Sequence, residues 1–305
     1  MNRARSILFI ILLSLTFGSA QAIIGSFKLN APAIRAVDVD SNIPAGRAAG
    51  EYDIALLIGN RNYPREGIPN VDYAHNDLKT MRNYLQKTMG FRADNIIVEK
   101  DLTKGSFETL FGTAANPRGK LQRYLMAGES KLFIYYVGHG APDPESGDGF
   151  FVPVDADPDY IANSGYKLAT FYANLKRLPA KQTIVVLDAC FSGRTQKGLL
   201  FKNVSPALLK VNESQFGLSS GAVFSSARGS QLSTWYPKKR HSMFSYYFFK
   251  GMQGAADSNS DGKITSGEMQ HYVAKNVRYM AGRVAGKDQE PQMEGEKGLV
   301  LAHLR

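Results

Sequence analysis

The fold is decided by two stretches of the 305-residue sequence: residues 131–140 read KLFIYYVGHG, and residues 182–193 read QTIVVLDACFSG. Each begins with an apolar run of strand length and ends in small and polar residues. Further strands are predicted at 52–60, 95–99 and 222–226, and helices over 72–89 and within 116–126. Strands that are apolar throughout and alternate with helices indicate a parallel sheet covered on both faces. We therefore predict an α/β fold of three layers, with a mostly parallel central sheet flanked by helices.

The composition is that of a globular protein, with 44% hydrophobic and 21% charged residues, and it excludes a mainly disordered chain. The formal net charge is +10, but Lys and Arg are spread along the chain, and the longest basic cluster is Lys238-Lys239-Arg240. A dispersed positive charge is typical of a solvated surface, so no nucleic-acid partner is expected.

The first residues predict export. Arg3 and Arg5 precede an apolar run over 7–17, and the small-residue pattern Ala20-Gln21-Ala22 follows, in the order of a secretory signal peptide. The run is too short to cross a bilayer, so residues 1–22 are expected to be removed, which leaves a secreted or periplasmic protein without a membrane span. The alternative is an N-terminal anchor that is not cleaved. Residues 23–50 are expected to form a linker or pro-segment before a folded domain at 51–305.

A histidine and a cysteine follow the two deciding strands. Because ligands bind beyond the carboxyl ends of parallel strands, we expect His139 and Cys190 to lie together at one edge of the sheet. A nearby imidazole lowers the pKa of a thiol and can later protonate a leaving amine. Cys190 is the only cysteine of the chain, which makes it either a reactive thiol or a small buried residue. A structural histidine in a glycine turn is the corresponding alternative for His139.

Cys190 lies 51 residues after His139, which matches the caspase spacing. At this point the sequence resembles the caspase-like cysteine peptidases, in particular metacaspases, paracaspases and their bacterial relatives, from about Tyr52 to Leu304. The resemblance implies that Cys190 is the nucleophile and His139 the general acid and base, without an acidic third member. It also implies that the backbone N–H groups of Gly140 and Cys190 hold the oxyanion. The matching stretches are Ile58-Gly59-Asn60 with Tyr63, His75-Asn76-Asp77, YYVGHG, DACFSG, FSSARG at 224–229 and SMFS at 242–245.

The residue before Ala189 indicates which bond is cut. Caspases, which cleave after aspartate, carry Gln two residues before the nucleophile, whereas this chain has Asp188 there. The resemblance to metacaspases and paracaspases implies a substrate with Arg or Lys at the cleaved position, bound by Asp188 and by a second carboxylate, Asp77. A bidentate pair with a carboxylate favours Arg over Lys. The alternatives are a strand-end cap for Asp188 and a helix-terminus interaction for Asp77.

A calcium-type loop is predicted near the C-terminus, where residues 257–268 read DSNSDGKITSGE and fit the EF-hand pattern. The donors would be side chains of Asp257, Asn259, Asp261 and Glu268, the carbonyl of Lys263 and a water-mediated contact of Thr265. Because the chain has a single loop of this type, the calcium ion is expected to be structural and not part of a sensor; the alternative is an acidic turn without metal.

The chain has no H-E-x-x-H and no P-loop, which excludes a zinc peptidase and a nucleotide hydrolase, and no organic cofactor is expected.

The predicted function is that of an exported cysteine endopeptidase that hydrolyses peptide bonds after Arg or Lys through a Cys/His dyad. Two alternatives come from other classes: a non-catalytic caspase-like binding or scaffold module, and a cysteine transpeptidase or amidase that acts on cell-wall peptides. The matched specificity also predicts cleavage of the chain itself after Arg194, Lys197 or Lys202.

Overall fold

The computed structural model describes residues 38–195, 198–200, 220–229 and 231–305. The expected signal peptide at 1–22, the first part of the expected linker, and the possible cleavage sites Lys197 and Lys202 lie outside the described residues.

The centre of the fold is a six-stranded sheet in the order β14-β10-β7-β3-β1-β2. Its strands are β1 Ile54–Gly59, β2 Ile96–Lys100, β3 Lys131–Val137, β7 Gln182–Asp188, β10 Gly221–Ser225 and β14 Gln292–Gly295. All neighbours are parallel except β10 and β14, which are antiparallel. The predicted α/β fold with a mostly parallel central sheet is confirmed, and β14 is an addition that the sequence did not indicate.

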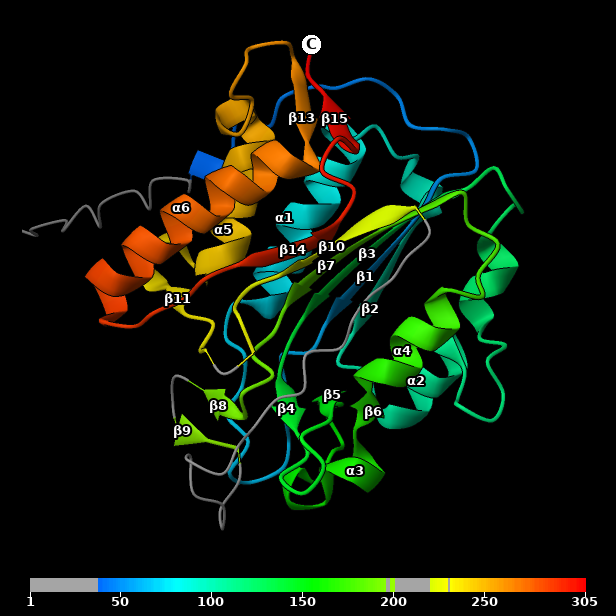
Figure 1. The fold of residues 1–305 in the computed structure, drawn as a ribbon, viewed down its shortest axis with the longest axis vertical. Helices are drawn as coiled ribbons and strands as arrows, with labels where there is room; N and C mark the ends of the chain where they lie inside the picture. Colours follow the sequence, from blue (N-terminus) through cyan, green and yellow to red (C-terminus); the bar gives the residue numbers. More distant parts are fainter. Residues whose placement is uncertain (1–37, 196–197, 201–219, 230) are drawn as a thin grey trace, which may run out of the picture. The chain divides into compact units, whose positions relative to one another are not determined.

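Helices cover both faces of the sheet (Figure 1). One face carries α1 Ala74–Lys87, α5 Met243–Lys250 and α6 Ser266–Ala285, and the other carries α2 Lys104–Phe111 and α4 Leu168–Leu175. Strand β3 supplies both cores, because successive side chains of a strand point to opposite faces. Phe133, Tyr135 and Val137 join the first core, and residues 132, 134 and 136 join the second.

The helix expected within 116–126 is instead a short 3-10 helix, η3 Lys120–Tyr124. The true helix of this region, α2, lies earlier in the chain, where the Thr103 side chain caps it by accepting the Ser106 N–H at 3.2 Å. A threonine cap satisfies an amide that the first helical turn leaves unpaired.

The smaller elements are η1 Asp38–Asp40, η2 Ala93–Asn95, β4 Gly140–Pro142, β5 Gly149–Phe151, η4 Pro158–Tyr160, α3 Ile161–Ser164, β6 Tyr166–Lys167, β8 Arg194–Thr195, β9 Gly198–Leu199, β11 Trp235–Tyr236, η6 Pro237–Lys239, β12 His241–Ser242, the π-helical turn η7 Gly251–Ala255, β13 Lys263–Thr265 and β15 Val300–His303.

The described chain packs against the domain from residue 38 on, earlier than the boundary expected at Glu51. Val39 is completely buried, and its carbonyl accepts the Tyr84 hydroxyl at 2.9 Å. The Gly46 N–H donates to the Lys87 carbonyl at 2.8 Å. Small residues and prolines made this segment resemble a linker, but single side chains such as Val39 anchor it to the domain.

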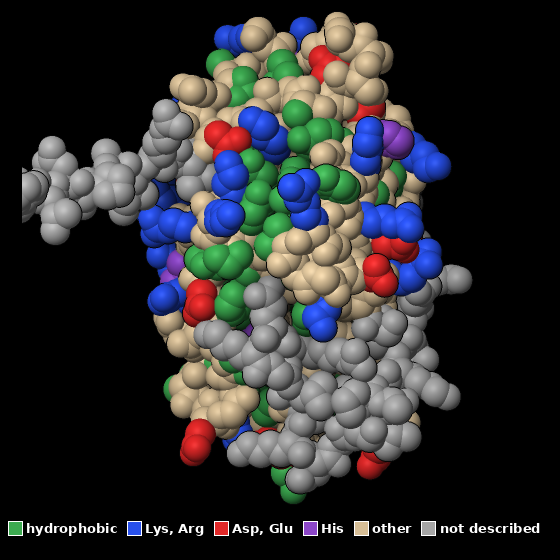
Figure 2. Space-filling model, turned by 90° about the vertical axis from the view of Figure 1, so that its left-hand side faces the viewer, with side chains coloured by type: hydrophobic (Ala, Val, Ile, Leu, Met, Phe, Trp, Pro, Cys, Tyr) green, Lys and Arg blue, Asp and Glu red, His purple; other side chains and the backbone are tan. Residues whose placement is uncertain are grey.

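The surface shown in Figure 2 carries Lys and Arg side chains scattered among acidic, polar and apolar ones. They do not form one continuous basic stripe on this face. No helix in the described part of the chain is long and apolar enough to cross a membrane.

Candidate active site

His139 and Cys190 lie at the carboxyl ends of two adjacent strands. In the register of β3 and β7, Val137 pairs with Asp188, so the residues that follow each strand emerge at the same edge of the sheet. Both side chains line one cavity of about 40 Å³, together with Ser233 and Trp235. A space of this size holds a few water molecules.

The His139 ring is held by contacts with Pro69 and Tyr63. Its Nε2 lies 2.7 Å from the Pro69 carbonyl oxygen, and its ring packs against Tyr63 with centroids 4.8 Å apart. A carbonyl oxygen can only accept, so Nε2 must carry the proton of that hydrogen bond. In the neutral imidazole Nδ1 is then the basic nitrogen. The Tyr63 hydroxyl also accepts the His139 N–H at 3.2 Å, which fixes the backbone of this turn.

The Cys190 thiol is partly buried, and its Sγ accepts a hydrogen bond from the Ser233 N–H. Burial raises the pKa of Cys190 to about 12, the Ser233 N–H opposes that rise, and the negative charge of Asp188 adds to it. This direction is opposite to the lowered thiol pKa expected from the sequence. The thiol is therefore protonated at neutral pH in this arrangement, and a base must remove its proton before it can attack.

Gly140 packs directly against the residues around the thiol. A Cβ atom at this position would lie 2.6 Å from the Phe191 ring and 2.9 Å from the Cys190 carbonyl oxygen, so a larger residue would displace the turn. The close approach brings the backbone at 140 and at 190 together. Oxyanion binding by the two N–H groups stays a prediction.

Asp188 is the charged group of the cavity. Its side chain is 4% exposed, and three serine hydroxyls donate to it. Ser233 bonds to Oδ1 at 3.1 Å, whereas Ser242 and Ser245 bond to Oδ2, the latter at 2.5 Å. Burial raises the pKa of Asp188 even though these hydroxyls favour the charged form. Among the described residues no cationic side chain pairs with it, so a buried carboxyl group lies beside the nucleophile without a cationic partner.

Asp77 is not among the residues that line this cavity. It is completely buried on the first turn of α1, where its Oδ1 lies 2.5 Å from His241 Nδ1 and its Oδ2 accepts the Ser242 N–H at 3.2 Å. Burial disfavours the imidazolium, but hydrogen bonds to Asp40 and Asp77 outweigh it and raise the pKa of His241 to about 9. A direct role of Asp77 in substrate binding stays a prediction.

The loop at 257–268 joins η7 to α6, and β13 within it pairs with β15. Its side-chain oxygens accept backbone N–H groups of the loop: Asp257 binds those of Asp261 and Gly262, at 3.2 and 3.0 Å. Glu268 accepts from Thr265 and Ser258. Within the described ranges, no group of three or more His, Cys, Asp or Glu side chains is arranged to hold a metal ion. The donor types suit calcium, but Glu268 would have to exchange these hydrogen bonds for the ion.

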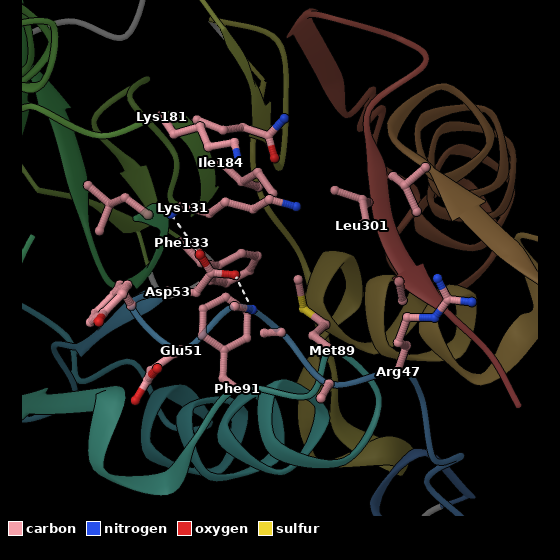
Figure 3. Close-up of a pocket in the computed structure, with 18 of the residues that line it drawn as sticks. Arg47, Glu51, Asp53, Met89, Phe91, Lys131, Phe133, Lys181, Ile184 and Leu301 are labelled. Atoms are coloured by element: carbon pink, nitrogen blue, oxygen red, sulfur yellow. Dashed lines mark hydrogen bonds between the residues drawn. The ribbon is translucent and has the colours of Figure 1, made fainter. Parts of the chain in front are cut away.

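A larger cavity, of about 530 Å³, lies at the opposite edge of the sheet, where β1, β3 and β7 begin (Figure 3). The Asp53 carboxylate beside it accepts the N–H groups of Gly50 and Lys131, both at 2.8 Å, and thereby ties the starts of two strands together. His139, Cys190 and Asp188 do not line this cavity. The chemistry, and not the size of the space, therefore identifies the candidate active site.

Several contributors to the site were not found from the sequence. The Pro69 carbonyl, which orients His139, has no sequence signal because it is a backbone group. Ser233, Ser242 and Ser245 surround Asp188 from segments far along the chain. The spacing of Ser242 and Ser245 is a helix N-cap pattern, and it could have drawn attention to them.

Comparison with known proteins identifies the family and the fold of this chain. The family model described as the caspase domain matches residues 53–298. Among solved structures, the chain is similar to caspase-1 from Spodoptera frugiperda, with a TM-score of 0.56 and 14% identity over 87% of this chain and 97% of the other. A search of curated proteins returned no match. The chain thus belongs to the caspase-domain family, which supports the general activity of a cysteine peptidase on protein substrates.

Proposed function

We propose that this chain is an exported cysteine endopeptidase that cleaves after Arg or Lys through a dyad of Cys190 and His139. The observation that carries the specificity is Asp188, a carboxylate that is 4% exposed, beside the nucleophile and without a cationic partner in the described part of the chain. A buried charge without a counter-charge is costly. A guanidinium or ammonium group of the substrate would supply the missing charge, whereas a substrate aspartate would be repelled.

The proposed chemistry begins with proton transfer. Nδ1 of His139 takes the proton of the Cys190 thiol, and Sγ forms a bond to the scissile carbonyl carbon while the oxygen becomes an oxyanion. The N–H groups of Gly140 and Cys190 stabilise that oxyanion. The carbon–nitrogen bond then breaks, and His139 returns its proton to the leaving amine. Water, deprotonated by His139, attacks the thioester, which releases the acid product and restores the thiol.

A bound cation also helps the nucleophile. The negative charge of Asp188 contributes to the raised pKa of the Cys190 thiol, after burial itself. A substrate cation next to Asp188 cancels that charge and lowers the pKa of the thiol when the correct side chain is in place. Specificity and activation are therefore coupled through one carboxylate.

The test is turnover of fluorogenic peptides that differ only at the cleaved position, which carries Arg, Lys, Asp or citrulline. Citrulline has nearly the shape of Arg but no charge, so it isolates the contribution of the cation. We expect cleavage after Arg and Lys that is absent in Cys190→Ala, with little cleavage after citrulline. Cleavage after Asp, or equal rates for Arg and citrulline, would refute the basic specificity, and a folded wild type without any turnover would refute the peptidase.

We also propose that the loop at 257–268 binds a structural calcium ion, supported by donor residues at every EF-hand position. An ion that binds only the folded state raises the melting temperature with increasing concentration. Thermal unfolding with chelator and with calcium tests this proposal, and magnesium serves as the control ion. An unchanged midpoint in millimolar calcium would contradict it.

Export is proposed on the order of residues 1–22 alone. N-terminal sequencing of protein recovered outside the cytoplasm tests it, with Ile23 as the expected new N-terminus. An unprocessed N-terminus in a cytoplasmic fraction would contradict it.

A further inference from the structure

His241 lies behind the specificity pocket, between two carboxylates. Its side chain is completely buried; Nδ1 lies 2.5 Å from Asp77 Oδ1, and Nε2 lies 3.2 Å from Asp40 Oδ1. The side chains of Asn76, at 3.4 Å from the ring nitrogens, and Phe249 complete its surroundings. Carboxylates only accept, so an imidazole between two ionised carboxyl groups carries a proton on both nitrogens. Burial raises the pKa of Asp77 to about 7, and its hydrogen bond to His241 opposes that rise.

The network continues from His241 to the pocket. Ser242 donates its N–H to Asp77 at 3.2 Å and its hydroxyl to Asp188. Asp77 is thus paired with His241 and Ser242 and does not line the cavity, whereas Asp188 lines it and accepts only serine hydroxyls among the described side chains. In this arrangement Asp188 is the carboxyl group that a ligand in the cavity can reach, and Asp77, paired with His241, serves as a support.

The other end of the network belongs to the segment before the sheet. Asp40 lies in η1, and it also accepts the Thr80 hydroxyl at 2.5 Å. Asp38 of the same 3-10 helix instead pairs with Lys239 at 3.0 Å and Lys250 at 3.2 Å. The segment is thus tied to the domain by two acidic residues, and only Asp40 contacts His241.

We propose that His241 is a positioning residue of the specificity pocket, clamped by Asp40 so that it neutralises Asp77 and fixes Ser242 against Asp188. The proposal rests on the proposed function, since it explains how one of two buried carboxylates is reserved for the substrate cation. It also gives the segment at 38–41 a role in substrate binding from behind the pocket. Substrate does not touch His241, and the proton transfers of Cys190 and His139 do not pass through it.

The first test compares single variants of the full chain on a peptide with Arg at the cleaved position. His241→Gln removes the positive charge and is expected to raise KM about tenfold, with kcat within about threefold of wild type. Asp40→Asn is expected to raise KM in the same direction by a smaller factor. Asp38→Asn is the matched control, because it weakens the same segment without contacting His241, and its KM should stay within about twofold of wild type.

The second test is rescue. The double variant Asp77→Asn with His241→Gln removes both charges of the His241–Asp77 pair, and its two amides can hydrogen-bond; KM is expected to return to within about threefold of wild type. A double variant that binds Arg more weakly than His241→Gln alone would overturn the proposal, because Asp77 would then receive the substrate itself. A His241→Gln effect on kcat with unchanged KM would also overturn it, as would equal effects of Asp38→Asn and Asp40→Asn.

Folding controls keep the test decisive. Circular dichroism and thermal unfolding are recorded for every variant, and Asp40→Asn, whose side chain is 32% exposed, provides the readout if His241→Gln does not fold. If the folded wild type does not cleave after Arg at all, the proposed function fails and the positioning role fails with it. If the wild type cleaves after Arg and the variants do not change KM, the positioning role alone fails.

Discussion

Replacing Asp188 by asparagine is expected to separate activity from stability. The change keeps the size of the side chain and removes the buried negative charge that three serine hydroxyls surround. Breaking one partner of a buried, hydrogen-bonded charge pair costs about 2 to 5 kcal/mol. Since 1.4 kcal/mol is a factor of ten, kcat/KM for an Arg peptide should fall by roughly 30-fold to several thousand-fold.

Stability is expected to change in the opposite direction. Burial raises the pKa of Asp188, so the folded state holds its proton more tightly than the unfolded chain does. At neutral pH this carboxylate therefore lowers the free energy of unfolding. The neutral amide of Asp188→Asn removes this destabilisation. The melting temperature of Asp188→Asn should equal or exceed that of wild type, with about 2–4 °C for each 1 kcal/mol gained.

The assay pairs steady-state kinetics on Arg and citrulline peptides with thermal unfolding of the same preparations. Asp188→Asn should cleave both peptides at similar low rates, because the pocket no longer distinguishes charge. Ser233→Ala is the matched control, since it removes one hydroxyl from Asp188 and leaves the charge in place. A loss of less than about tenfold in kcat/KM for Arg, or a variant that is clearly less stable than wild type, would refute the argument from an unpaired buried charge.

Three further changes test other parts of the structure. Gly140→Ala places a Cβ 2.6 Å from the Phe191 ring, and we expect kcat to fall at least tenfold (about 1.4 kcal/mol) while the protein remains folded; wild-type kcat in this variant would contradict the required close approach. The raised pKa of His241, about 9, means that the folded state binds this proton more tightly than the unfolded chain; its contribution to stability is complete below about pH 6.5 and is lost as pH rises through 9. Urea unfolding at pH 6, 8 and 10 measures that loss, and His241→Gln should show a smaller decline over the same interval; parallel curves would contradict the assignment. Glu268→Gln is expected to abolish the rise of the melting temperature in calcium, and an undiminished rise would place the ion elsewhere.

Much of the fold could be predicted because local patterns and tertiary structure agree in its centre. The run at 131–137 is apolar on both faces, and the structure buries both faces of β3. Agreement ends at the edges of the sheet. Strand β14 contains Gln292, Met293, Glu294 and Gly295, which do not alternate as a strand pattern, and it is a strand only because β10 offers it an unpaired edge.

For the site, the sequence by itself determined that His139 and Cys190 lie together, because strand ends of a parallel sheet meet at one edge. It also proposed them as the reacting pair, because a thiol and an imidazole carry recognisable chemistry. It also pointed to Asp188, through the residue type at one position. Only the tertiary structure decided that the Pro69 carbonyl orients His139 and that His241 forms a hydrogen bond with the Asp77 carboxyl group. Backbone carbonyls have no residue signature, and a charge pair between positions 77 and 241 depends on how α1 and β12 pack. Whether a buried carboxylate has a positively charged partner therefore depends on the residues that the fold brings next to it, and no local sequence pattern encodes those neighbours.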